Sequence, residues 1–176
     1  MQFIVVCTDV LTGQAVYHDM QHVSYEELEW LRASASMPLV SKVVEVEGHK
    51  LLDGGVSDSI PLSYFESIGY DRNVVILTQP LGYRKAPSKL MPLMRLSLRK
   101  YPQFVKAMSE RYLMYNKQLD YVAQAEAEGR CLVIRPDEKI PIGHISHDAE
   151  QMRRVYEIGR QVGERYIEKI KEFYAH

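Results

Sequence analysis

The stretch Lys50-Leu51-Leu52-Asp53-Gly54-Gly55 decides how the fold of this chain is interpreted. It predicts a short apolar strand that ends on a carboxylate, followed by a sharp turn in which two glycines allow positive φ and the close approach of another group. Open α/β sheets place their chemistry at the carboxyl ends of strands. Pro61 then predicts the start of a helix. A plain turn is the alternative, because Asp-Gly is a common turn dipeptide.

Composition limits the class of protein. The 176 residues suffice for a sizeable core, and 46% apolar and 26% charged residues are typical of a globular domain. A net charge of −1 gives no general attraction to nucleic acid, so no nucleic-acid partner is predicted. Cys7 and Cys131 lie in apolar runs and predict buried thiols in a reducing, cytoplasmic setting. No apolar run approaches the roughly 20 residues of a membrane-spanning helix.

The first half of the sequence alternates strand and helix patterns, which favours an α/β layered sheet. Strands are predicted at 2–9, 15–17, 43–46, 50–52 and 73–78, and helices at 25–35 and 61–68. The run at 3–7 is apolar on both faces, which is the pattern of a central parallel strand. Because this strand starts so near residue 1, we expect an N-terminal part of the sheet to be missing from the sequence.

After Pro80 the pattern becomes mainly helical. Helices are predicted at 88–100, 102–128 and 148–174, with a late strand at 131–134. The last helix carries apolar residues at i, i+3, i+4 and i+7 spacing. Gly159 and Gly163 lie on its apolar face, so we expect a neighbouring element to approach the helix closely there.

Three segments in order resemble bacterial patatin-like phospholipases. They are Cys7-Thr8-Asp9, Ala33-Ser34-Ala35-Ser36-Met37-Pro38, and the stretch from Leu52-Asp53-Gly54-Gly55 to Pro61-Leu62. Together they are similar to the second part of that family's domain. The resemblance implies an α/β fold in which residues 1–82 are part of a three-layer α/β/α domain and residues 83–176 are a mostly helical extension packed on it.

The resemblance also implies an activity, the hydrolysis of lipid acyl esters by a Ser–Asp dyad through an acyl-serine intermediate, without a cofactor. Asp53 would be the base, and Gly54 and Gly55 would form its turn. A base must come within hydrogen-bond reach of the nucleophile's proton, which a strand end beside glycines allows. The family's G-x-S-x-G elbow and glycine-rich oxyanion loop do not occur in this sequence. We therefore expect the 176 residues alone to be inactive toward esters.

Two other acids are candidates for lining the same site. Asp9 follows a strand, and its alternative role is a helix cap or turn acid. Asp58 follows the glycine turn, and its alternative role is a solvated loop acid. His144, His147 and Asp148 are spaced too loosely for a convincing metal site, so no metal is predicted.

A basic segment lies between Asp71 and Glu110, where no acidic residue occurs. Its candidate lipid-contacting residues are Arg84, Lys85, Lys89, Arg95, Arg99 and Lys100, interleaved with leucine and methionine. Such a segment can lie on an anionic membrane surface. The alternative is a helix packed on the core with a solvated basic rim. With a lipid substrate, the first interpretation predicts a cytoplasmic protein at the membrane periphery.

Two further expectations concern function and assembly. The alternative to an enzyme is a non-catalytic lipid- or protein-binding module derived from the same fold, whereas no ligand spacing supports a redox or metal protein around Cys7 and Cys131. A half-sheet would leave the strand at 3–7 or the strand at 74–78 with an open edge. Open edges pair with other chains, so we expect self-association.

Overall fold

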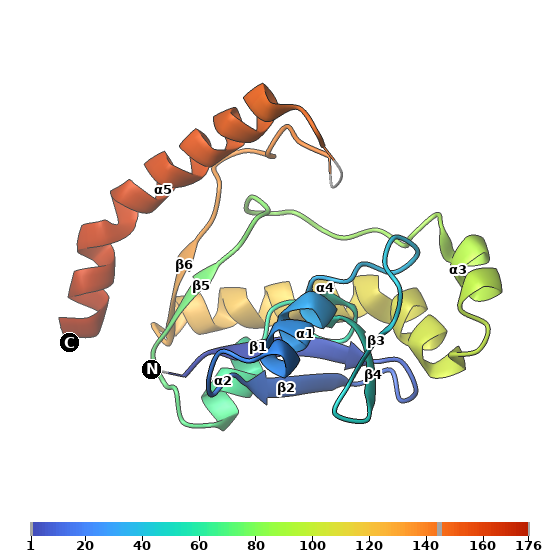
Figure 1. Cartoon of the computed structure of the whole chain (residues 1–176). Coiled ribbons are helices and arrows are strands. Elements are labelled where there is room, and N and C mark those ends of the chain that lie inside the picture. The colour runs from blue at the N-terminus through green and yellow to red at the C-terminus, as the bar shows by residue number, and fades with distance from the viewer. Residues whose placement is uncertain (1, 144–145, 176) are drawn as a thin grey trace. The chain divides into compact units, whose positions relative to one another are not determined.

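The computed structural model describes residues 2–143 and 146–175 and contains mixed strands and helices, as expected for the α/β class (Figure 1). The chain divides into two compact units, each with its own sheet. Unit 1 comprises Met1–Pro61 and Lys85–Leu119, and unit 2 comprises Leu62–Arg84 and Asp120–His176. The boundary near residue 82 was predicted as the end of the patatin-like part of the sequence. It is a different kind of boundary from the one between the two units, and it stays a prediction.

The sheet of unit 1 has four antiparallel strands in the order β2-β1-β4-β3. They are β1 (Ile4–Asp9), β2 (Ala15–Asp19), β3 (Val44–Val46) and β4 (His49–Asp53). The predicted central position of the first strand is confirmed. The predicted parallel pairing is wrong, because β1 runs antiparallel to both neighbours. Since β1 is also paired on both sides, it offers no open edge.

Two apolar clusters explain why these strands are apolar on both faces. Leu51 and Leu52 are adjacent on β4 and therefore point to opposite faces of the sheet. Leu51 belongs to a cluster with Val5, Cys7, Trp30, Ala33, Val44 and Val46. Leu52 belongs to a second cluster with Val10, Val56, Met94, Phe104 and Met108. Burial from both sides by other elements, rather than parallel pairing, thus produces the apolar sequence.

Helix α1 (Tyr25–Ser34) supplies the first cluster with Trp30, whose side chain is only 2% exposed. The Trp30 ring stacks on the His18 ring at a centroid distance of 4.2 Å. Its Nε1 donates a hydrogen bond to Glu47 Oε2 at 3.1 Å. Glu47 and Gly48 form the tight β3–β4 turn with φ of 48° and 80°, as a two-residue hairpin requires. The tryptophan thus ties α1 to the hairpin.

The second cluster is completed by two helices. Helix α3 (Met91–Ser97) is shorter than the predicted span of 88–100. Its Pro92 fits the first turn, where a missing backbone N–H costs nothing. Helix α4 (Pro102–Ala127) begins at the proline that was expected to separate the two helices. The part of α4 in unit 1 contributes Phe104 and Met108 to the core.

Unit 2 contains a parallel pair, β5 (Asn73–Ile76) and β6 (Cys131–Ile134). The unit also contains three helical parts. Helix α2 (Leu62–Ser67) precedes β5 in the sequence, the last turns of α4 precede β6, and helix α5 (Ala149–Ala175) follows β6. All these elements lie within two residues of their predicted bounds, and β5 pairs only with β6 in the described part of the chain. The predicted open edge therefore belongs to β5 rather than to β1.

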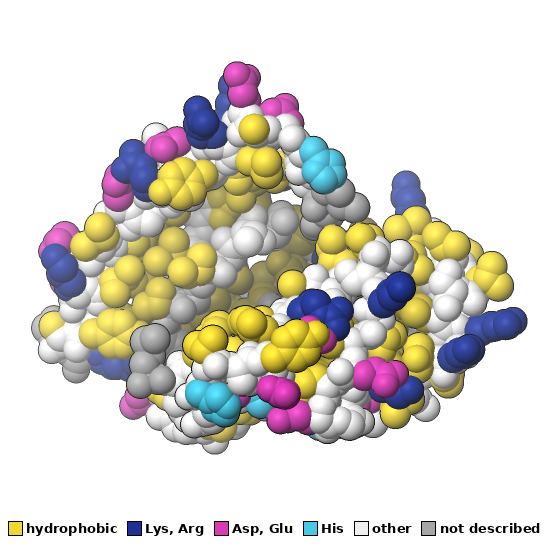
Figure 2. Space-filling model, viewed as in Figure 1, with side chains coloured by type: hydrophobic (Ala, Val, Ile, Leu, Met, Phe, Trp, Pro, Cys, Tyr) yellow, Lys and Arg dark blue, Asp and Glu magenta, His cyan; other side chains and the backbone are white. Residues whose placement is uncertain are grey.

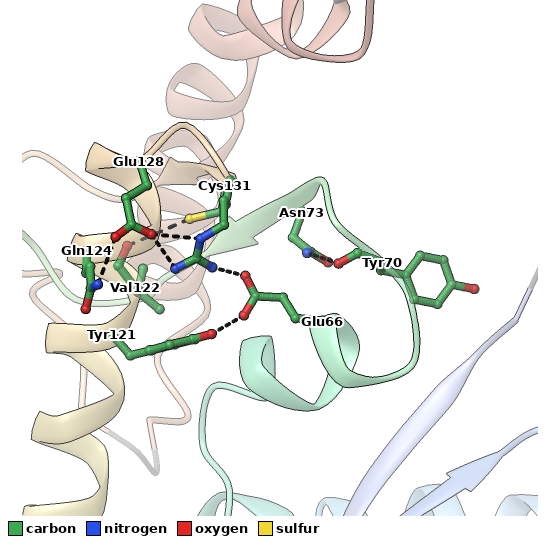
Figure 3. Close-up of polar contacts among 9 residues, drawn as sticks. Glu66, Tyr70, Asn73, Tyr121, Val122, Gln124, Glu128 and Cys131 are labelled. Carbon is green, nitrogen blue, oxygen red and sulfur yellow. Dashed lines mark hydrogen bonds and ion pairs between the residues drawn. The ribbon is translucent and has the colours of Figure 1, made fainter.

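An ion-pair network joins the elements of unit 2 (Figure 3). Glu66 on α2 accepts a hydrogen bond from the Tyr121 hydroxyl and pairs with the Arg130 guanidinium. Arg130 also pairs with Glu128, with Nη2 and Oε2 2.7 Å apart, and its Cζ lies 5.5 Å from the centre of the Tyr121 ring. The network connects α2 to the end of α4 and to the start of β6.

The sequence predicted that a neighbouring element covers helix α5 closely at its two glycines, and the structure differs on this point. A Cβ at Gly159 or Gly163 would meet no described atom within 4 Å, so the predicted close neighbour is wrong. Val162 is buried, whereas Met152, Tyr156, Ile167 and Tyr174 are exposed, and Figure 2 shows apolar side chains along this helix. Amphipathic spacing alone could not tell whether a partner is present. Among the described helices, none is long and apolar enough to cross a membrane.

Candidate functional site

Asp53 is the last residue of β4, and neighbouring groups hold it on several sides. Its backbone N–H donates to Ser36 O at 2.9 Å, and its carbonyl accepts from Thr8 Oγ1 at 2.8 Å. Its Oδ1 accepts from the N–H of Gly55 at 2.7 Å. Its Oδ2 makes no hydrogen bond to any described residue. The predicted carboxylate at a strand end is therefore present, with one oxygen fixed and one available.

The two glycines act through close approach rather than through positive φ. Gly54–Val56 forms a short 3₁₀ turn, η1, directly after Asp53, and neither glycine has positive φ. A Cβ on Gly54 would lie 2.1 Å from the carbonyl oxygen of Val6 on β1. A Cβ on Gly55 would lie 3.1 Å from Asp53 Oδ1. Gly54 thus lets the turn pack against β1, and Gly55 leaves room for the Asp53 carboxylate.

A cavity of about 550 Å³ lies beside Asp53 within unit 1. Its lining is mainly apolar where it comes from β1 and α1 and mainly polar where it comes from Asp53 and the loop that follows. The lining residues are Phe3, Ile4, Val5, Val6, Leu31, Ser34, Ala35, Asp53, Gly55, Asp58, Ser59 and Pro61. A carboxylate at the edge of an apolar cavity is a typical arrangement for a small-molecule site.

The two other candidate acids have different places. Asp58 lines the same cavity, but both of its oxygens are engaged, with Tyr17 Oη and Gln118 Nε2 each 2.5 Å away. Asp9 does not line the cavity. Its Oδ1 accepts from the N–H groups of Leu11 and Thr12 at 2.8 and 3.0 Å. The structure therefore brings Asp53 and Asp58 together and gives Asp9 the alternative role of a turn acid.

Sequence reasoning missed two side chains from α4 that hold the loop after Asp53. Arg111 Nε donates to Gly55 O at 2.5 Å. Gln118 Oε1 accepts from the N–H groups of Ser59 and Ile60 at 3.2 and 3.0 Å, while its amide nitrogen donates to Asp58. The spacing of seven residues, which places Arg111 and Gln118 on one face of α4, was the only available signal.

We predict that Gln118→Leu destabilises unit 1 by about 1–3 kcal/mol, because it leaves two backbone donors and a carboxylate without their partner. Urea unfolding measures the loss, and amide exchange at Ser59 and Ile60 locates it. The neighbouring Lys117 is exposed, and Lys117→Ala serves as the matched control, with an expected change within about 0.5 kcal/mol. Equal stability and equal exchange in the two variants would contradict this role of Gln118.

Nucleophilic side chains close to the turn are already engaged. Ser57 Oγ and Thr8 Oγ1 are 2.8 Å apart, and Ser59 Oγ donates to Gly55 O at 2.6 Å. Cys7 pairs with Asp53 across β1 and β4 and is fully buried. Burial, together with the charge of Asp53, raises the pKa of the Cys7 thiol to about 12. Because the thiolate is the reactive form, Cys7 is an inert thiol at neutral pH.

The remaining candidates concern metal and lipid. His144 lies outside the described residues, and within them no three His, Cys, Asp or Glu side chains gather as a metal site. Arg84 pairs with Asp120 at 2.5 Å, in unit 2. In unit 1, Lys85 Nζ lies 4.9 Å from the centre of the Tyr115 ring, and burial together with the charge of Arg111 lowers the pKa of Lys85. The other predicted lipid-contacting residues, Lys89, Arg95, Arg99 and Lys100, are exposed.

Comparisons with known proteins find sequence similarity in two segments of the chain. Residues 6–66 match the family model of patatin-like phospholipases, and residues 101–175 match a domain of unknown function, DUF6363. The chain is 25% identical over 185 residues to lysophospholipase nte1 of Aspergillus terreus and 24% identical over 184 residues to lysophospholipase nte1 of Emericella nidulans. Each alignment covers 97% of this chain and 11% of the relative, so the chain spans a small part of these relatives' length.

The matched segment contains the elements that form the site. It includes β1 from Val6 onward, α1, the β3–β4 hairpin and the Asp-Gly-Gly turn. Of these, β1, α1, the end of β4 and the turn contribute residues to the cavity beside Asp53. Arg111 and Gln118, which hold the turn, lie in the segment that matches the domain of unknown function. Through residues 6–66, this chain is therefore similar to patatin-like phospholipases.

Proposed function

We propose that this chain carries the base of a lipid acyl hydrolase, with Asp53 as the acid–base member of a Ser–Asp dyad. The observation that supports it best is the Asp53 carboxylate beside the cavity, whose Oδ1 is fixed by Gly55 N–H while its Oδ2 has no hydrogen bond to a described residue. A fixed carboxylate of this kind can accept the proton of a serine hydroxyl as the serine attacks an ester carbonyl. The proton then passes to the leaving alcohol, and water hydrolyses the acyl-serine.

The cavity suits an acyl ester. Its apolar lining from β1 and α1 can bury part of a hydrocarbon chain, and the polar residues of the turn lie on the side where an ester group would react. Its volume of about 550 Å³ falls within the usual range for small-molecule sites, about 300–1,000 Å³. The relatives' names, lysophospholipase, make a lysophospholipid the first substrate to test.

The 176 residues alone should not turn over an ester, because they contain no G-x-S-x-G elbow and the serines beside the turn donate to the loop or pair with Thr8. We expect neither hydrolysis of a p-nitrophenyl acyl ester nor stoichiometric labelling by a fluorophosphonate. Mass spectrometry of the labelled chain checks this, with the double variant Ser57→Ala and Ser59→Ala as the control. Label on a single serine that the double variant loses would identify a nucleophile in the turn.

The proposed function is tested by supplying the serine of the dyad, which this sequence does not contain in a G-x-S-x-G elbow. In a chimera, a patatin-like segment with G-x-S-x-G precedes residue 2, and fluorophosphonate uptake shows whether its serine is activated. Fatty-acid release from lysophosphatidylcholine above the level of a variant without the elbow serine is the expected result. A folded chimera in which neither label nor fatty acid appears would overturn the proposal.

The non-catalytic module is the second candidate, and one observation favours it. The loop after Asp53 is held by two α4 side chains and by its own serines, as a binding scaffold would be. A chimera that binds lysophospholipid without releasing fatty acid would select the module. Self-association through the unpaired side of β5 and a cytoplasmic, membrane-peripheral location remain predictions of the same proposal.

A further inference from the structure

We call residues 86–100, which comprise helix α3 and its flanking residues, the α3 lobe. Only some of its apolar side chains are buried in the core of unit 1, and the others are exposed. Met94 is buried in the second cluster, and Met91 and Leu98 pack against it from the same side of the helix. On the other side, Leu90, Leu93 and Leu96 are 55%, 50% and 69% exposed. A helix that is apolar all round is normally covered on every side. Here one side of it is open.

The α3 lobe also carries positive charges that no described carboxylate neutralises by an ion pair. Lys89, Arg95, Arg99 and Lys100 are exposed, and none of the four pairs with a carboxylate in the described part of the chain. On α5, by contrast, Arg160 pairs with both Glu157 and Glu164. Figure 2 shows apolar and basic side chains together over α3. The lobe is therefore a local cationic and apolar surface on a chain whose net charge is −1.

The charge selects the kind of partner. A second copy of the chain docked lobe to lobe would bring eight cations together, and like charges across an interface oppose association. An anionic lipid surface meets both features, because its headgroups attract the cations and its acyl boundary accepts the leucines. Arg84 and Lys85, which the sequence grouped with the other cations, are outside this surface because Asp120 and Tyr115 engage them.

We propose that the α3 lobe is a membrane-docking surface, in which Leu90, Leu93 and Leu96 enter the interface of a bilayer while Lys89, Arg95, Arg99 and Lys100 bind anionic phospholipid headgroups. The role of this docking rests on the proposed lipid hydrolase function, because docking would bring the cavity of unit 1 close to lipid substrates in the bilayer. The binding itself needs no catalysis. It can therefore be measured on the chain as it is.

The test is sedimentation with vesicles of ether-linked phosphatidylcholine, with and without phosphatidylserine. The wild-type chain should bind the anionic vesicles and bind the neutral ones far more weakly. Replacing the four lobe cations by glutamine should weaken binding about 600-fold, since each cation near an anionic surface contributes about fivefold. Replacing Leu93 and Leu96 by serine should remove the binding that persists at raised salt, because screening leaves the apolar part unaffected.

Matched controls use the same number and type of substitution elsewhere. Arg153, Arg154, Lys169 and Lys171 on α5 supply four exposed cations, and Leu11 and Leu113 supply two exposed leucines of unit 1. Their glutamine and serine variants should bind as the wild type does. Failure of the wild type to bind, or lobe variants that bind equally well, would overturn the docking surface. The chimera's action on soluble esters is measured separately, so loss of docking and loss of hydrolysis are distinguishable.

Discussion

Replacing Asp53 by asparagine in the active chimera is expected to lower kcat by ~10²–10⁴, the range for loss of a general base. The asparagine oxygen can still accept the hydrogen bond that Gly55 N–H gives to Oδ1. The turn and the cavity should therefore stay in place, and KM should change little. Initial rates of fatty-acid release from lysophosphatidylcholine, measured over a range of substrate concentrations, give both constants.

The control for Asp53 is the second carboxylate of the same cavity. Asp58 has both oxygens engaged by Tyr17 and Gln118, so Asp58→Asn should affect stability more than the rate of the folded protein. Circular dichroism of all variants shows that the fold is retained. A normal kcat in a folded Asp53→Asn chimera would exclude Asp53 as the base, even if lipid hydrolysis itself is confirmed.

Gly54→Ala is expected to destabilise unit 1 by about 3 kcal/mol or more, at or beyond the upper end of overpacking effects. The added Cβ would lie 2.1 Å from the Val6 carbonyl oxygen and 2.4 Å from its carbon. The backbone of Val6 cannot easily withdraw, because β1 is hydrogen-bonded to β2 on one side and to β4 on the other. Urea unfolding followed by circular dichroism measures the change.

The same substitution at Gly159 separates a steric effect from a general effect of alanine. Gly159 lies inside α5, and a Cβ there meets no described atom within 4 Å. Alanine should raise the stability of that helix by up to about 1 kcal/mol, the difference in helix propensity. If Gly54→Ala unfolds at the wild-type urea concentration, the close approach of the turn to β1 is not a requirement of the fold.

Sequence patterns predicted local features better than distant contacts. The strand 50–52, the carboxylate at its end and the helix after Pro61 follow from apolar runs, glycine and proline, whose effects act on the residues beside them. The direction of β1 could not be predicted, because a strand buried on both faces has the same composition whether its partners are parallel or antiparallel. The roles of the two glycines depended on the position of Val6, which no local pattern reveals.

The loop contacts of the site were the hardest to predict. Arg111 meets Gly55 across 56 residues of sequence, and Gln118 meets Asp58 across 60. Neither residue carries a motif, and polar residues on a helix are usually solvated. A periodic pattern gives the face on which such side chains lie but not the partner they reach, so only the folded chain shows that α4 holds the catalytic turn proposed here.

The buried indole at position 30 has a consequence for spectroscopy. Trp30 is the only tryptophan of the chain, and it belongs to unit 1. It lies 2% exposed, against the His18 ring and within hydrogen-bond reach of Glu47. Its intrinsic fluorescence therefore reports on unit 1 selectively, free of tryptophan emission from unit 2. The protein thus carries a built-in optical label, and a shift of its emission toward the red would signal that water has reached the α1 side of the sheet.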